Sequence, residues 1–287
     1  MFIDFASTPP DFIRRSEHLQ NYRRVYKSSE TKTAKTLGPN TLQSYLAMYE
    51  ALATTKVVIK ARDNRTTFGF SVPNADVAEF CRTDERFLGF AAVDPHRGTS
   101  AVSDFELAIM NLGLKGLNLQ CFEHRLRPND ERLFPLYEKC VELDVPVNIH
   151  CGINFSLSSL IDYGRPIYLD EVLTSFPKLR VCASPPGWPW VHELIALAWR
   201  HPNLWIGVVA VRPRLLAKNG SGYEPLLTYG KTILQDRMIF GSAFPMIDVA
   251  QSLGELERLG LSADVLEKWR GRNAAAFLGI TQGSSTA

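Results

Sequence analysis

Residues 3–10 read Ile3-Asp4-Phe5-Ala6-Ser7-Thr8-Pro9-Pro10. The apolar first half of this stretch predicts a short buried strand. The small polar residues and the two prolines that follow predict that the strand ends abruptly, since proline cannot donate a backbone hydrogen bond to a sheet. A strand that opens a chain and leads directly into a proline-rich loop is typical of a β/α barrel.

The remainder of the chain alternates short apolar runs with amphipathic segments. We expect strands at 57–59, 87–93, 114–120, 145–150, 179–183, 204–209 and 238–241. We expect helices at 41–53, 74–82, 99–111, 130–143, 167–176, 190–200, 223–234, 248–259 and 263–278. With the opening strand, this pattern gives eight strands that alternate with helices. It predicts an α/β fold in which a parallel sheet closes into a (β/α)8 TIM barrel.

The length of 287 residues suits a single barrel domain spanning 1–287, because such barrels are typically about 250 residues long. No change of composition marks a second domain. Residues 11–37 are polar and basic with a helical pattern, which predicts a helical arm inserted after the first strand. The small polar residues 282–287 predict a loose tail.

Composition excludes several classes of function. The net charge of +2 and the apolar share of 45% are ordinary for a globular protein. We expect no nucleic-acid binding, because the basic bias of 11–37 fits a solvated or interface arm. We also expect no membrane span and no secretory signal. The five scattered cysteines indicate a reducing, cytoplasmic location without disulfides.

In such a barrel the active site is built from the residues that close each strand. These residues are, in chain order, Ala6 and Thr8, Arg62 and Asp63, Asp94-Pro95-His96, Asn118 with Gln120 and Cys121, His150, Ser184-Pro185-Pro186, Gly207, and Ser242-Ala243.

Several longer segments match one family in the correct order. They are Ile3-Asp4 with Pro9-Pro10, Phe87 to Pro95, Gly113 to Leu117, Pro135 to Glu138, Val145 to His150, Gly187-Trp188-Pro189-Trp190, His201-Pro202-Asn203, Phe240 to Pro245, and Asn273-Ala274-Ala275. On these segments the chain resembles the amidohydrolase-related family, the branch of the amidohydrolase superfamily that includes decarboxylases of aromatic acids. The resemblance runs from end to end and implies a metal-dependent TIM barrel.

The resemblance also implies where the metal ligands of the family would lie. Its first-strand His-x-His pair falls on Ala6 and Thr8, its fifth-strand histidine on His150, its sixth-strand histidine on Pro185 and its eighth-strand aspartate on Ala243. The fourth-strand position, which some members fill with a carboxylated lysine, is Asn118. A catalytic Zn²⁺ needs about three protein ligands. We therefore expect no metal at these positions, and no metal-activated water or aspartate base.

Two other sites can be built from the strand ends. Cys121, His124 and His150 would form a rebuilt zinc site if they met at the barrel mouth, with Cys151 pointing away from it. Lys60 and Arg62, together with Asn118 and Gln120, would bind a small carboxylate. For Lys60 and Arg62 the alternative is an ion pair with Asp63 or Asp94.

The remaining polar and aromatic candidates have structural interpretations. His150 is either a hydrogen-bonded remnant of a metal site or a catalytic base. We expect His96, His192 and His201 to be structural or exposed. The segment Trp188-Pro189-Trp190 either packs over the barrel mouth or forms an interface.

Two hypotheses of function follow. In the first, the chain is a non-catalytic subunit of a homo- or hetero-oligomer that assembles with a metal-bearing paralogue, which the resemblance implies to be a hydrolase, a decarboxylase or a two-subunit oxygenase. The arm at 11–37 and the segment 188–190 are its candidate contacts. In the alternative, the chain is a metal-independent hydrolase or decarboxylase. Lys60 and Arg62 would then bind a small carboxylated substrate, and His150 would transfer the proton.

Overall fold

The computed structural model describes residues 1–13 and 41–280. Most of the predicted arm at 11–37 and the predicted tail at 282–287 lie outside the described residues. Within the described residues, the barrel strands are β1 (Ile3–Ser7), β2 (Lys56–Lys60), β5 (Phe87–Phe90), β6 (Leu117–Leu119), β7 (Val147–Ile149), β8 (Val181–Ala183), β9 (Leu204–Val209) and β10 (Met238–Gly241).

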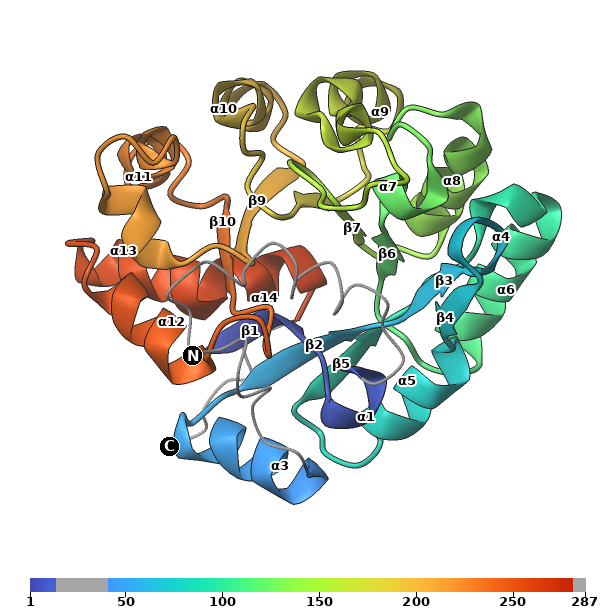
Figure 1. Cartoon of the computed structure of the whole chain (residues 1–287), viewed down its shortest axis with the longest axis horizontal. Coiled ribbons are helices and arrows are strands. Elements are labelled where there is room, and N and C mark those ends of the chain that lie inside the picture. The colour runs from blue at the N-terminus through green and yellow to red at the C-terminus, as the bar shows by residue number, and fades with distance from the viewer. Residues whose placement is uncertain (14–40, 281–287) are drawn as a thin grey trace.

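These strands form a closed parallel barrel (Figure 1). One parallel sheet runs in the order β1-β2-β5, and a second runs in the order β10-β9-β8-β7-β6. Parallel bridges between Ser7 and Phe244 and between Ala91 and Leu117 join the two sheets at both seams. The predicted (β/α)8 TIM barrel is confirmed. β7 is its fifth strand and β10 its eighth.

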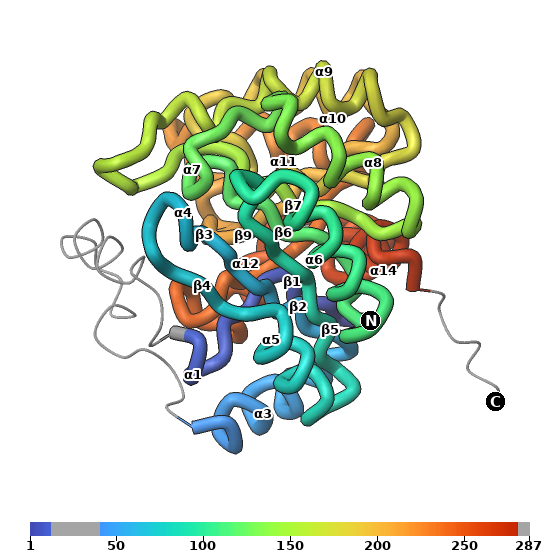
Figure 2. Tube along the Cα trace, turned by 90° about the vertical axis from the view of Figure 1, so that its right-hand side faces the viewer, coloured from blue at the N-terminus to red at the C-terminus, as the bar shows by residue number. Residues whose placement is uncertain are grey.

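Helices surround the barrel, as the two perpendicular views show (Figures 1 and 2). The main ones are α3 (Leu42–Ala51), α5 (Asn74–Cys81), α6 (Thr99–Met110), α8 (Phe134–Glu142), α9 (Leu169–Ser175), α10 (Val191–Arg200), α11 (Glu224–Gly230), α12 (Val249–Glu257), α13 (Ala263–Glu267) and α14 (Asn273–Leu278). Short helices are α1 (Pro10–Ile13), α4 (Arg65–Phe68) and α7 (Cys121–His124). No helix in the described residues is long and apolar enough to cross a membrane.

The structure departs from the sequence expectations in three places. After β2 the chain makes an antiparallel hairpin of β3 (Arg62–Asn64) and β4 (Phe70–Val72), with α4 between them. Gly69, at φ 64°, ends α4 in the left-handed conformation that glycine adopts freely. The loop after β6 begins with α7. The helix expected at 263–278 is interrupted by a π-helical turn at Lys268–Arg272.

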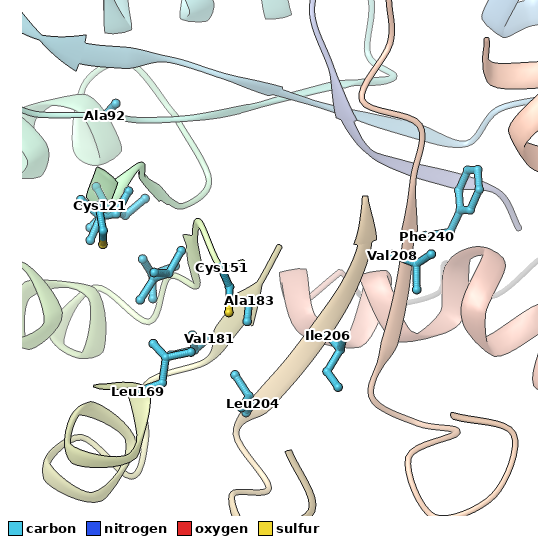
Figure 3. Close-up of a cluster of buried hydrophobic side chains, with 14 of the residues drawn as sticks. Ala92, Cys121, Cys151, Leu169, Val181, Ala183, Leu204, Ile206, Val208 and Phe240 are labelled. Carbon is cyan, nitrogen blue, oxygen red and sulfur yellow. The ribbon is translucent and has the colours of Figure 1, made fainter. Parts of the chain in front are cut away.

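Alternation along each strand divides its side chains between two apolar layers. The outer layer fills the space between strands and helices. Figure 3 shows part of it, with Val181 and Ala183 of β8 and Ile206 and Val208 of β9 in one cluster near Leu169 of α9. The inner layer lies in the barrel lumen and comprises Ile3, Phe5, Val58, Phe90, Cys182, Trp205 and Ile239 among others. Side chains two residues further along the same strands therefore face the carboxyl-terminal mouth.

The lumen is closed at its amino-terminal side by aromatic packing. Phe277 of α14 contacts both Phe5 and Trp205, with ring centroids 5.4 Å apart in each pair. The Arg237 guanidinium lies over the Trp205 ring at 5.0 Å. These rings fill the amino-terminal side of the barrel interior, opposite the carboxyl-terminal mouth.

Candidate functional site

The residues that close the barrel strands lie together at the carboxyl-terminal mouth of the barrel. The Ala243 N–H donates to the Ala6 carbonyl at 2.8 Å, and the Thr8 N–H donates to the Phe244 carbonyl at 2.8 Å. On the other side, the Ser184 N–H donates to the Ile149 carbonyl at 3.0 Å, which sets Pro185 beside His150. The five positions that the resemblance assigns to metal ligands thus close four strands at one end of the barrel.

The side chains at these positions do not fit a catalytic metal. Alanine and proline offer no side-chain donor, and the hydroxyl of Thr8 is a poor ligand beside a single imidazole. Within 1–13 and 41–280 there is no group of three or more His, Cys, Asp or Glu side chains that could hold a metal ion. We therefore assign no metal-dependent reaction step to these positions.

The rebuilt zinc site is not assembled. Cys121 and Cys151 lie in the outer apolar layer (Figure 3), and burial raises the pKa of the Cys121 thiol to about 12. His124 is buried on α7, where its backbone carbonyl faces His96 Nε2 at 2.8 Å. His150 instead packs its ring against Phe122, with centroids 4.4 Å apart. The alternative in which Cys121, His124 and His150 converge on zinc finds no support within the described residues, because Cys121 lies in the outer layer and faces away from the lumen.

Ala243 adopts a backbone conformation that alanine rarely occupies. Its φ is 56°, in the left-handed region, where a Cβ clashes with the following carbonyl. Aspartate and asparagine are several-fold enriched there among non-glycine residues. Strain of this kind often marks functional sites, so the turn after β10 has a geometry that suits an aspartate better than the alanine it carries.

Replacing Ala243 with glycine is expected to raise the free energy of unfolding by about 1 kcal/mol, because glycine removes the left-handed strain. The matched control is Ala196→Gly on the exposed side of α10, which should lower the free energy of unfolding by about 1 kcal/mol. Urea unfolding of the two variants measures both values. Equal destabilisation by the two changes would show that Ala243 is not strained.

Lys60 is the basic residue that points into the lumen. It ends β2 on the same face as Val58, and its Nζ lies 4.3 Å from the centre of the Phe5 ring. Burial lowers the pKa of the Lys60 amine to about 8, with the charge of Asp4 opposing this effect and that of Arg62 adding a smaller lowering. Its side chain is only half-buried. The amine therefore stands inside the barrel but within reach of the mouth.

A chain of amide and hydroxyl groups lines the lumen beside Lys60. Asn118 Nδ2 donates to the Ala61 carbonyl at 3.0 Å, and Asn148 Nδ2 donates to Asn118 Oδ1 at 2.9 Å. Ser184 Oγ donates to Asn148 Oδ1 at 2.7 Å, and Gln120 Nε2 donates to Asn118 Oδ1 at 3.2 Å. Asn118 and Gln120 were predicted for the site. Ser184 was among the strand-closing residues expected at the mouth. Asn148 was missed, although a polar residue in an otherwise apolar strand is a signal of a polar lumen.

Arg62 is held away from the lumen by an ion pair. Its Nη1 contacts Glu123 Oε1 at 2.8 Å, and Glu123 is completely buried. The alternative partners considered for it were wrong. Asp63 binds Arg65 through two hydrogen bonds, and Asp94 accepts the backbone N–H groups of Thr66 and His96. The structure thus separates Lys60, which faces the lumen, from Arg62, which anchors α7.

The other histidines and the tryptophan segment occupy the surroundings of the barrel. His201 Nε2 contacts Asp170 Oδ1 at 2.7 Å, and His192 is exposed on α10. Trp188 is 36% exposed, and its backbone carbonyl accepts the Ile153 N–H at 2.7 Å. The segment therefore joins the loop after β7 to the loop after β8.

Sequence reasoning missed the buried carboxylate of Asp4. This side chain accepts hydrogen bonds from the Ser242 N–H at 2.8 Å, the Ser242 hydroxyl at 2.6 Å and the Tyr49 hydroxyl at 2.9 Å. Burial raises the pKa of its carboxyl group. Asp4 thereby ties the first barrel strand to the last and to α3, just below the mouth.

Solved structures with similar folds cover nearly the whole chain. An uncharacterized TIM-barrel protein from Bordetella bronchiseptica has 27% identity and a TM-score of 0.80, over 97% of this chain and 98% of that chain. The 5-carboxyvanillate decarboxylase from Sphingomonas paucimobilis has 15% identity and a TM-score of 0.69, over 98% and 99%. The 2,6-dihydroxybenzoate decarboxylase from Rhizobium has 17% identity and a TM-score of 0.69, over 97% and 98%. At these last two identities the likeness shows the fold.

The similar structures show the fold, and a match to a family model shows the family. The model described as amidohydrolase matches residues 37–280, which is most of the chain and includes all barrel strands except β1. The chain therefore belongs to the amidohydrolase family.

Proposed function

We propose that this chain is a non-catalytic member of the amidohydrolase family that serves as a subunit beside a metal-bearing paralogue. The observation that carries the proposal is the donor set at the mouth. One imidazole, His150, stands where about three metal ligands are needed, while the barrel around it is kept. A barrel fold that is retained without its metal site suits a subunit that assembles with a paralogue whose metal site is intact.

An exposed apolar surface supports the assembly role. Trp199 of α10 is 63% exposed, and its ring lies 6.1 Å from that of Tyr229 on α11. Ile167, in the turn before α9, and Ile233, after α11, are 44% and 48% exposed. Aromatic residues are enriched at the centres of protein interfaces, so we assign the subunit contact to this α10 surface.

Co-expression with a paralogue encoded nearby tests this proposal. We expect the two chains to co-purify, with the metal in the paralogue, and Trp199→Glu to reduce the complex at least about tenfold. Leu107→Glu on α6, a position 53% exposed, is the control and should leave the complex intact. A chain that remains alone with every such paralogue would contradict the subunit role.

The Lys60 amine favours a second candidate function, a metal-independent decarboxylase or hydrolase for a small carboxylated substrate. Two of the structural relatives are named decarboxylases of hydroxylated aromatic acids, which suggests that substrate class. Protonated Lys60 would bind the carboxylate, and His150 at the mouth would transfer the proton. Carbon dioxide release from such acids by the purified chain, lost in Lys60→Met and His150→Ala, is the result that would support it. Unchanged release in both variants would reject it.

A further inference from the structure

Lys60 has an unusual set of contacts for a lysine inside a protein. Within the described residues, no hydrogen bond or ion pair to its Nζ is found, and its closest defined contact is the face of Phe5 at 4.3 Å. Lysine side chains that are partly removed from water are ordinarily paired with an acid, because an unpaired charge is costly in an apolar surrounding. The Asp4 carboxylate acts on Lys60 through its charge but makes its hydrogen bonds with Ser242 and Tyr49.

We propose that Lys60 is a carbonyl-binding nucleophile, which forms an imine with a small aldehyde or 2-oxo acid that enters through the barrel mouth. The inference depends on neither candidate function, since it concerns binding in the lumen and not assembly or decarboxylation. The sequence predicts that Lys60 binds a carboxylate through its charge. We now infer that Lys60 binds a carbonyl compound covalently.

The surroundings of Lys60 raise the share of its amine that is neutral and reactive. Burial lowers the pKa of the Lys60 amine to about 8, although the charge of Asp4 acts in the opposite direction. At pH 7 roughly a tenth of such an amine is neutral, against well under a thousandth for an ordinary lysine with a pKa of about 10.4. Lysines desolvated in this way are activated as nucleophiles toward carbonyl groups.

The lumen also offers polar groups for the ligand. Asn118 donates to the carbonyl of Ala61, the residue after Lys60, so its amide lies against the same end of β2. Gln120 is half-buried nearer the mouth and is bonded to Asn118. These amides can accept and donate hydrogen bonds to a hydroxyl or carboxylate carried by the ligand. An acid group beside the carbonyl of the ligand can accept the remaining amide hydrogen of Gln120, whose other one is bonded to Asn118.

The covalent step conserves atoms and electrons. The lone pair of the neutral Nζ attacks the carbonyl carbon, and one amine proton moves to the former carbonyl oxygen, which gives a carbinolamine. That hydroxyl is protonated and leaves as water while the nitrogen lone pair forms the C=N bond and the nitrogen releases its last proton to solvent. One amine and one carbonyl thus give one imine and one water, with no oxidation or reduction.

Reductive trapping tests the proposal. The full chain is incubated at pH 7 with glyoxylate and sodium cyanoborohydride, which delivers a hydride to the imine carbon and fixes it as a secondary amine. Peptide mapping by mass spectrometry should find carboxymethyl groups on Lys60 at least about tenfold faster than on Lys56, because burial lowers the pKa of the Lys60 amine. Lys56 is the matched control, since it lies at the other end of the same strand and donates to the Glu85 carbonyl.

Two further measurements make the outcome decisive. Lys60→Arg keeps the positive charge but cannot form an imine, and it should abolish the fast labelling. Acetaldehyde, which lacks the carboxylate, should label Lys60 more slowly than glyoxylate does relative to Lys56. Labelling of Lys60 at the rate of Lys56 in the unaltered chain would overturn the proposal without any variant that could misfold.

Discussion

Replacing Asp4 with alanine is expected to lower the free energy of unfolding by about 3–5 kcal/mol, which would place it among the most damaging single changes in the chain. The side chain is fully buried and accepts hydrogen bonds from Ser242 and Tyr49. Its removal would leave the Ser242 N–H and the Tyr49 hydroxyl buried without an acceptor and would open a cavity between β1, β10 and α3. Urea denaturation followed by circular dichroism measures the loss.

A conservative variant of Asp4 and a control at an exposed carboxylate complete this experiment. Asp4→Asn keeps the shape and one acceptor oxygen, and the hydroxyls of Ser242 and Tyr49 can rotate to accept from its amide, so it should cost only about 1–2 kcal/mol. Asp104→Ala removes an exposed carboxylate that pairs with Arg97, and it should change stability by less than about 1 kcal/mol. If Asp4→Ala were as mild as Asp104→Ala, Asp4 would not join the two ends of the barrel.

A restored donor set is expected to produce the second large effect. The variant Ala6→His, Thr8→His and Ala243→Asp, together with the native His150, would place three imidazoles and one carboxylate at the mouth. Four such ligands suit a tetrahedral Zn²⁺. The left-handed backbone at Ala243 accommodates aspartate, so that change should not damage the fold. We expect stoichiometric Zn²⁺ after dialysis, and a gain of about 2.7 kcal/mol in unfolding free energy at a zinc concentration one hundred times the dissociation constant.

The control for the restored site is the same variant with His150→Ala, which removes one ligand and should lose most of the zinc. A folded variant that binds no more zinc than the parent chain would show that these four positions do not converge. In that case the correspondence between Ala6, Thr8, His150, Ala243 and the family's ligands, which rests on the sequence resemblance, would be wrong.

The barrel was predictable from sequence because every strand is a short apolar run followed by a helix with an apolar stripe. The strands at 204–209 and 238–241 agree with β9 and β10 to the residue. The hairpin of β3 and β4 was missed because its two strands are only three residues each and include polar residues such as Asp63 and Asn64. No periodicity can be recognised over so few residues.

The site was predictable only in part, because its important contacts join distant segments. Alternation predicted that Lys60 and Arg62 would share a face, but Lys60 ends β2 while Arg62 begins β3 and is held by an ion pair. The partner that holds Arg62, Glu123, lies on a short helix after a different strand. The buried position of Asp4 likewise depends on Ser242, 238 residues away. Strand alternation gives the face of a residue, but it does not give its partner across the barrel.

Metal analysis of the purified chain tests whether the barrel mouth holds a metal ion. The chain would be produced alone in medium supplemented with zinc and manganese, dialysed, and measured by elemental mass spectrometry, with the restored Ala6→His, Thr8→His and Ala243→Asp variant as a positive control. We expect metal far below stoichiometry in the native chain and stoichiometric metal in the variant. Stoichiometric zinc or manganese bound to the native chain alone would contradict this expectation.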